Sequence, residues 1–140
     1  MITAYIDGGS RGNPGPAGFG VQIVDGDGTV IAELCGSLPD TTNNVAEYHG
    51  LLAALSWAVD HGHGPLHVRS DSELLVKQLR GEYRVKHPGL QPLYRDARAL
   101  IGRIGHVTFE HVRRELNKQA DRLANLAMDQ AAERRVPTDC

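Results

Sequence analysis

Four acidic residues in separate parts of the chain have the types and surroundings that could do chemistry together. They are Asp7, Glu47, Asp71 and Asp121. Carboxylates that cluster repel one another, which raises their pKa values, and a divalent cation relieves that cost. Their hard oxygen ligands favour Mg²⁺ or Mn²⁺ over zinc. Two such ions roughly 4 Å apart can activate water and stabilise the departing oxygen in phosphodiester cleavage.

Taken singly, each acid also has an ordinary structural explanation. Asp7 follows an apolar stretch, where an aspartate commonly begins a turn. Glu47 comes three residues after Asn44 and could close a capping box at the start of a helix. Asp71 could begin a helix after a strand, and Asp121 could be a first-turn acid favoured by the helix dipole. Only their convergence at one place would support a function.

The elements that must position these acids begin with three strands. Residues 2–6, 20–24 and 29–34 are short, apolar and partly alternating. We expect the first strand to stop at Asp7-Gly8-Gly9, where the glycine- and proline-rich loop SRGNPGPAG follows. The turn Asp25-Gly26-Asp27-Gly28 then connects the second and third strands as a hairpin. The first third of the chain therefore predicts an antiparallel meander.

The remainder alternates helix and strand. Apolar spacing predicts a helix over 44–60, a strand over 66–69, a helix beginning at Ser70-Asp71-Ser72, a helix over 89–102, a strand over 106–112 and a last helix from Asn117. Strands joined through helices pair in parallel, so we predict an α/β fold: a five-stranded mixed sheet with helices on both faces. Ligands of such sheets bind outside the carboxyl ends of the strands, where the helices at 44 and 71 begin.

Length and composition indicate one compact domain over residues 1–132, followed by a flexible tail over 133–140. No apolar run is long enough to span a membrane, and the N-terminus does not have the pattern of a signal peptide. Two cysteines, Cys35 and Cys140, are too few for a disulfide framework. We therefore expect a reducing, cytoplasmic location. The sequence contains no P-loop, GxSxG or HExxH motif.

Charge is distributed unevenly along the chain. Residues 1–64 carry one basic and seven acidic residues, whereas residues 65–140 carry fourteen basic and ten acidic residues. Such asymmetry is compatible with a polyanionic partner and equally with an uneven solvated surface.

The sequence resembles type 1 ribonuclease H over nearly its whole length. Four motifs carry the resemblance, each with one of the four acids: YIDGGSRGNPGPAGFG, TTNNVAEYHGLLAAL, VRSDSELLVKQLRGEYRV and NKQADRLANLA. The resemblance implies hydrolysis of the RNA strand of RNA–DNA hybrids, leaving 5′-phosphate and 3′-hydroxyl ends. It also implies two Mg²⁺ ions, with Mn²⁺ as a substitute, when substrate is bound.

The resemblance assigns individual roles. Asp7 would bridge both ions, Glu47 and Asp71 would hold the ion at the leaving group, and Asp121 would help hold the ion that activates water. Residues implied to bind substrate are Ser10, Asn13, Thr42, Asn43, Asn44, Glu73, Arg80, Arg84 and Lys86. Thr42 resembles a contact to a DNA phosphate, and many relatives carry at position 73 a glutamine that contacts the RNA. Selectivity would then rest on the 2′-hydroxyl groups that only RNA offers.

Two departures from the best-known bacterial pattern place the chain with short-loop, handle-free members. The segment HVRRELNKQAD contains no histidine between Val112 and Asp121, and His111 lies too early to replace one. We expect Arg114 as the stand-in; because an arginine is too basic to carry protons, it would bind phosphate or help product release. The segment GEYRVKHPGLQP lacks a basic handle, so hybrid binding should be weaker and more sensitive to salt.

The resemblance also implies partners and leaves alternatives open. Double-stranded RNA is an expected second substrate, and we expect a monomer without membrane association. Similar actinobacterial-type proteins fuse this domain to a C-terminal histidine phosphatase domain, so a further domain in the full-length chain is an expectation. A DNA-cutting nuclease of the same fold and a non-catalytic hybrid-binding module remain the alternatives. The second is disfavoured because all four carboxylates are present.

Overall fold

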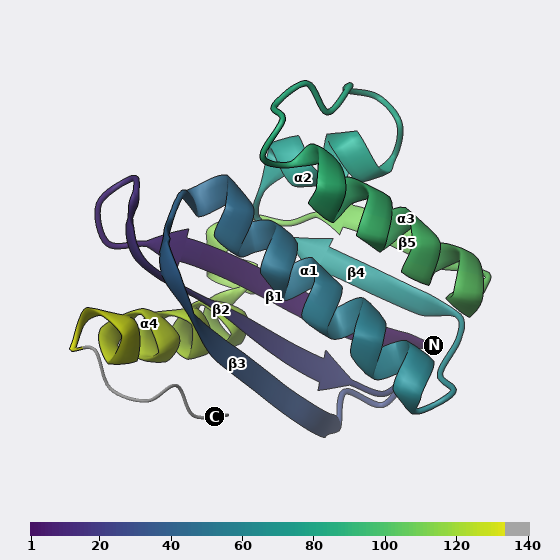
Figure 1. Cartoon of the computed structure of the whole chain (residues 1–140). Coiled ribbons are helices and arrows are strands. Elements are labelled where there is room, and N and C mark those ends of the chain that lie inside the picture. The colour runs from purple at the N-terminus through teal and green to yellow at the C-terminus, as the bar shows by residue number, and fades with distance from the viewer. Residues whose placement is uncertain (134–140) are drawn as a thin grey trace.

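The computed structural model describes residues 1–133. These residues form a five-stranded sheet with helices on both faces (Figure 1). Its elements are β1 (Ile2–Ser10), β2 (Gly15–Val24), β3 (Val30–Thr41), α1 (Asn43–Asp60), β4 (Leu66–Ser70), α2 (Glu73–Leu79), α3 (Gln91–Ile104), β5 (Val107–His111), the short 3₁₀ helix η1 (Arg114–Leu116) and α4 (Lys118–Ala132). The strand order is β3-β2-β1-β4-β5. Pairing is antiparallel for β3-β2-β1 and parallel for β1-β4-β5, which confirms the predicted mixed sheet.

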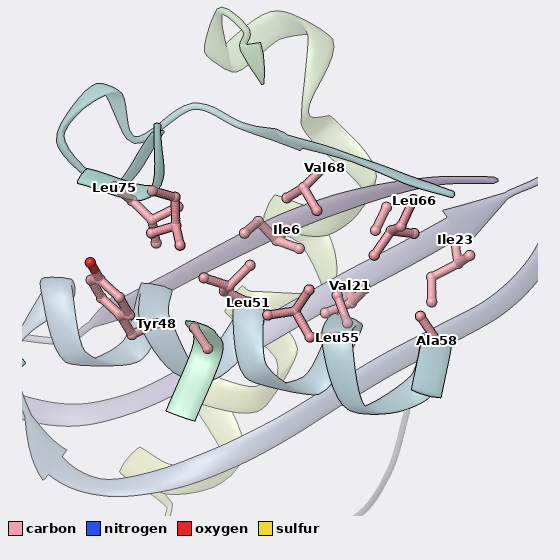
Figure 2. Packing of buried hydrophobic residues seen from close by; sticks show 14 of the residues in the cluster. Ile6, Val21, Ile23, Tyr48, Leu51, Leu55, Ala58, Leu66, Val68 and Leu75 are labelled. Carbon is pink, nitrogen blue, oxygen red and sulfur yellow. The ribbon is translucent and has the colours of Figure 1, made fainter. Parts of the chain in front are cut away.

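The main core lies between the sheet and α1. Residues of α1 at spacings of three and four point toward the sheet, because that spacing repeats about once per helical turn. Figure 2 shows them facing residues of the central strands. The packed residues include Ile6, Val21, Ile23, Tyr48, Leu51, Leu55, Ala58, Leu66, Val68 and Leu75. In Figure 1, α3 lies beside α1 over this face, while α4 covers the opposite face beneath β1, β2 and β3.

The prediction that the first strand stops at Asp7 is wrong, because β1 continues through Gly8 and Gly9 to Ser10. These glycines do not make a turn; they allow close packing. A Cβ at Gly8 would lie 2.4 Å from the backbone carbonyl group of Ala46 in α1. The second and third strands are likewise longer than predicted, and the loop between β1 and β2 is reduced to residues 11–14.

Helix starts also differ from prediction in one instructive place. The N-cap of α1 is Thr42, whose hydroxyl accepts a hydrogen bond from the backbone N–H of Val45 at 3.3 Å. A capping box between Asn44 and Glu47 is therefore wrong, since both residues lie inside the helix. The predicted start of α2 is confirmed, with Ser72 as its N-cap. Glu47 is thus free of the capping role that could have explained it.

The last helix, α4, ends at Ala132. Of the tail expected over 133–140, only Glu133 is within the described residues, so the expectation for the rest, including Cys140, lies outside them. No helix among residues 1–133 is long and apolar enough to cross a membrane.

Candidate active site

The sheet topology brings Asp7 and Asp71 to one place. β1 and β4 are neighbouring parallel strands, and Ile6 pairs with Ser70. Asp7 and Asp71 therefore follow at adjacent positions, on the edge of the sheet where the carboxyl end of β4 leads into α2 (Figure 1). This is the edge at which open α/β sheets bind ligands.

Glu47 and Asp121 reach the same place from the helices. The close approach of Gly8 to α1, where a Cβ would lie 2.6 Å from the backbone nitrogen of Glu47, sets Glu47 beside the residue after Asp7. α4 begins after Asn117, and Asp121 lies in its first turn. All four acids line a single open cleft of about 590 Å³. The convergence expected from the sequence is therefore present in the structure.

Asp7 has the most perturbed carboxyl group of the cluster. Burial raises its pKa from the ordinary 3.8 to about 8, and the negative charge of Asp71 adds to the rise. A side-chain hydrogen bond with Asp121 and the charge of Asp121 act in the same direction, while the backbone N–H of Gly8 opposes them. At neutral pH the Asp7 carboxyl therefore keeps its proton, which fits the hydrogen bond to its neighbour.

Two further acids of the cleft are perturbed for the same reasons. Burial raises the pKa of Glu47 to about 7; a hydrogen bond with Ser72 lowers it, and the charge of Asp71 raises it. Burial is also the largest cause of the raised pKa of Asp71, and the charge of Arg114 is the largest opposing cause. Full ionisation of this cluster at neutral pH therefore requires added positive charge.

Arginine and histidine side chains line the cleft beside the acids. Arg11, His111, Arg113 and Arg114 all contribute to its wall. The positive charge of Arg114 lowers the pKa of Asp71, so the guanidinium group lies near that carboxyl group within the cleft. His111, predicted to lie too early in the chain, also lines the cleft, because β5 ends alongside β4 with His111 opposite Ser70.

The loop between β1 and β2 is tied to the start of α1 by predicted substrate-binding residues. The backbone N–H of Ser10 donates to Oδ1 of Asn43 at 2.8 Å, and the Ser10 hydroxyl reaches the same oxygen at 3.3 Å. The backbone N–H of Asn43 donates to Oδ1 of Asn13 at 3.0 Å. Ser10 and Asn43 line the cleft, whereas Asn13 and Thr42 stand behind them as loop anchor and helix cap.

The structure does not bring the other predicted substrate-binding residues into the cleft. These are Asn44, Glu73, Arg80, Arg84 and Lys86. Glu73 forms an ion pair with Lys77 at 3.1 Å and lies 4.0 Å from Nδ1 of His111, on the rim. Arg80 pairs with Glu82 at 3.3 Å. Arg84 lines a separate groove of about 700 Å³ together with Tyr83 and Arg95.

The donor set of the cleft fits Mg²⁺ or Mn²⁺ in chemistry. It consists of carboxylate oxygens, which hard divalent cations prefer, and it lacks the positive charge that its raised pKa values call for. Within residues 1–133 no three acidic, histidine or cysteine side chains are yet arranged as a set that could hold a metal ion.

Sequence reasoning missed several residues of the cleft. Gly8 and Gly9 line it, although they were assigned to a turn, and Asn125 and Met128 of α4 line its far side. Asn125 and Met128 lie four and seven residues after Asp121, and this spacing, which keeps side chains on one helix face, is the signal that could have found them. His111 could have been found by aligning the ends of β4 and β5.

A mixed sheet of this order, with four carboxylates from four segments at its central edge, defines a ribonuclease H-like domain. Comparison with known proteins agrees. Residues 5–127 match the family model described as reverse transcriptase-like, and the chain belongs to this family, among the type 1 ribonucleases H.

Three relatives illustrate the similarity. The chain is 50% identical to Bifunctional protein Rv2228c of Mycobacterium tuberculosis over 94% of its own length, and it spans only 36% of that relative. The solved N-terminal RNase H domain of that protein superposes with a TM-score of 0.92 at 48% identity, covering 95% of this chain and 96% of that one. Ribonuclease HI of Halobacterium salinarum is 44% identical over 93% of this chain and 65% of its own length. LC11-RNase H1, solved in complex with an RNA/DNA hybrid, has a TM-score of 0.89 at 42% identity, covering 94% and 99%.

Proposed function

We propose that this chain is an endonuclease that hydrolyses the RNA strand of RNA–DNA hybrids and depends on divalent metal ions. The observation that carries the proposal is the convergence of four carboxylates, three with raised pKa values, in one open cleft. Relatives named ribonuclease HI and a similar structure solved with an RNA/DNA hybrid support the same substrate.

In this proposal Asp7, Glu47, Asp71 and Asp121 hold two Mg²⁺ ions, or Mn²⁺ in their place, when substrate is bound. When bound, the ions would activate water and stabilise the departing 3′-oxygen, so that the products carry 5′-phosphate and 3′-hydroxyl ends. The carboxyl groups of Asp7 and Asp121 must give up their mutual hydrogen bond to serve as ligands. Asp7, whose carboxyl group has the most strongly raised pKa of the cluster, would be the ligand shared between the two ions.

The remaining residues position the duplex. Ser10 and Asn43 form a fixed wall of the cleft, held from behind by Asn13, and present polar groups that can contact ribose 2′-hydroxyls. Thr42, Asn44 and Glu73 extend this surface along the duplex. Arg80, Arg84 and Lys86 contact the backbone phosphates farther away, where phosphate contacts give affinity and register without sequence preference.

Arg114 is proposed to contact the phosphate at the cut or the departing product. Its charge acts on Asp71, which supports a location at the reacting end of the cleft. A guanidinium group keeps its proton at physiological pH, so Arg114 stabilises negative charge and does not carry protons.

Cleavage assays with four labelled substrates test the proposal: RNA–DNA hybrid, double-stranded RNA, double-stranded DNA, and DNA with a short ribonucleotide patch, each with Mg²⁺ or Mn²⁺. We expect cleavage of the RNA strand of the hybrid and its loss in Asp71→Asn, while Asp60→Asn, which removes an exposed acid at the end of α1, retains it. Cutting of both strands, or cutting of double-stranded DNA at a similar rate, would favour the DNA nuclease. Hybrid binding without cleavage under either metal would favour the binding module.

Cleavage of double-stranded RNA is proposed as a second activity, because the chain resembles short-loop members. We further propose a cytoplasmic monomer with one domain over residues 1–132. We also propose that the full-length chain has an additional C-terminal domain of the histidine phosphatase kind. The relative described as bifunctional, of which this chain spans 36%, supports a further domain, and the kind of domain is proposed from the resemblance alone.

A further inference from the structure

A buried amide, Asn117, connects the segments that carry three of the four carboxylates. Asn117 lies between η1 and α4 and is only 1% exposed, which is unusual for an asparagine. Its backbone N–H donates to the carbonyl of Arg114 at 2.9 Å, so it also closes the turn that carries this arginine into the cleft.

The side chain of Asn117 binds the backbone directly before Asp7. Its Nδ2 donates to the carbonyl oxygen of Ile6 at 2.8 Å. Pairing between β1 and β4 ends at Ile6 and Ser70, so β4 offers no later residue beside this part of β1. The Asn117 amide takes that place and joins the start of α4 to the central strand.

The same residue reaches the other two acids. The Asn117 side chain forms a hydrogen bond with the Asp71 carboxylate. Its backbone carbonyl accepts from the N–H of Asp121 at 3.1 Å, one turn into α4. One amino acid therefore contacts the residue before Asp7, Asp71 itself and Asp121 itself.

Stability alone does not explain an asparagine at this position. Its Oδ1 atom is buried and, among residues 1–133, has no hydrogen-bond partner. A buried polar atom without a partner is unfavourable, and an apolar side chain of similar volume would avoid it. The contribution of this side chain is therefore the hydrogen bonds that its Nδ2 group donates.

We propose that Asn117 is a positioning residue that holds Asp7, Asp71 and Asp121 at the separation needed to share divalent cations. The inference rests on the proposed function for its purpose, but its contacts stand independently of the reaction. Asn117 does not line the cleft, so it acts through the three acids and not on substrate. Its loss should weaken metal binding and the chemical step while leaving hybrid binding intact.

The experiment measures Mn²⁺ binding by calorimetry without substrate, kcat and KM on hybrid, and thermal unfolding, for Asn117→Ala and Asn117→Leu. The leucine variant fills the buried volume and removes the orphaned oxygen, so it stays folded if the alanine variant does not. We expect Mn²⁺ affinity and kcat to fall by about 10- to 100-fold, as for residues that orient metal ligands, with KM changed less than about twofold.

Gln78→Met serves as the matched control. Gln78 is a buried amide, 5% exposed, that accepts a 2.6 Å hydrogen bond from the Tyr48 hydroxyl and does not line the cleft. This variant should lose thermal stability but keep Mn²⁺ affinity and kcat. If the Asn117 variants behave like Gln78→Met, with a lowered Tm and unchanged metal affinity, the positioning role is overturned.

The two proposals fail in different ways. A wild-type protein that binds Mn²⁺ but cleaves none of the four substrates overturns the proposed function, and the Asn117 variants are then judged on metal affinity alone. A wild-type protein that binds no divalent cation overturns both.

Discussion

Replacing Asp7 by asparagine should abolish cleavage and yet stabilise the metal-free protein at neutral and alkaline pH. The folded protein holds a proton on Asp7 up to about pH 8, whereas the unfolded chain releases it near the ordinary value of 3.8. Between these values the folded state binds more protons, so wild-type stability falls as the pH rises. Asparagine has a similar shape, carries no charge and can still donate to Asp121, so it avoids this loss.

The size of the effect follows from the same pKa. The rise from 3.8 to about 8, at about 1.4 kcal/mol for each pKa unit, sets a ceiling of about 6 kcal/mol above pH 8. The ceiling is not reached, because Asp71 and Asp121 relax when the charge is removed and the open cleft admits water. We expect about 2–3 kcal/mol, which corresponds to a Tm higher by about 10 °C for a domain of this size.

Thermal unfolding in EDTA between pH 4 and pH 9 measures this difference. The two proteins should have the same Tm near pH 4, and the variant should exceed wild type increasingly up to about pH 8. Adding Mg²⁺ should raise the Tm of wild type but not of the variant. Asp60→Asn controls for the change in net charge. Equal Tm values for Asp7→Asn and wild type at pH 8 would refute the argument that Asp7 is held protonated by its surroundings.

Two further predictions concern packing and substrate. Gly8→Ala should destabilise the fold by about 3 kcal/mol or more and reduce kcat, because its Cβ would lie 2.4 Å from the Ala46 carbonyl. Gly102→Ala, whose Cβ would have no atom within 4 Å, should instead stabilise α3 by about 0.5–1 kcal/mol. Chemical denaturation measures both free energies of unfolding, and an unchanged value for Gly8→Ala would contradict the close-packing argument. Arg84→Ala should lower the slope of log affinity against log salt by about one on hybrid while the RNA strand is still the one cut; an unchanged slope would remove Arg84 from the binding surface.

Much of the fold follows from local patterns in the sequence. The turn Asp25-Gly26-Asp27-Gly28 and the strands around it are predicted from hairpin chemistry, and the N-cap at Ser72 from a hydroxyl before an apolar helix. Parallel pairing of strands joined through helices then places Asp7 and Asp71 at adjacent positions without any tertiary information. The right-handed connection between parallel strands and the helical spacing of apolar residues are sufficient to predict these parts of the fold.

Other parts depend on contacts between distant segments. A glycine pair in isolation favours a turn, and only the presence of α1 against Gly8 explains why the strand continues there. Asn44 and Glu47 have the spacing of a capping box, but the N-cap is Thr42, so both residues lie inside the helix. The role of Asn117 depends on Ile6, 111 positions away in the chain, and no local pattern reports that contact.

The carboxylates converge even though they repel, because contacts of other residues fix their backbones. Pairing of Ile6 with Ser70 fixes the first two acids, the packing of Gly8 against Ala46 fixes Glu47, and the bond from Asn117 to Ile6 fixes the helix that carries Asp121. Because none of these contacts involves the carboxyl groups, the repulsion between the carboxyl groups does not break them, and the four backbone segments stay close together. The raised pKa values of Asp7, Glu47 and Asp71 are the result, and in the proposed function a divalent cation would supply the positive charge that lets these three acids ionise in place.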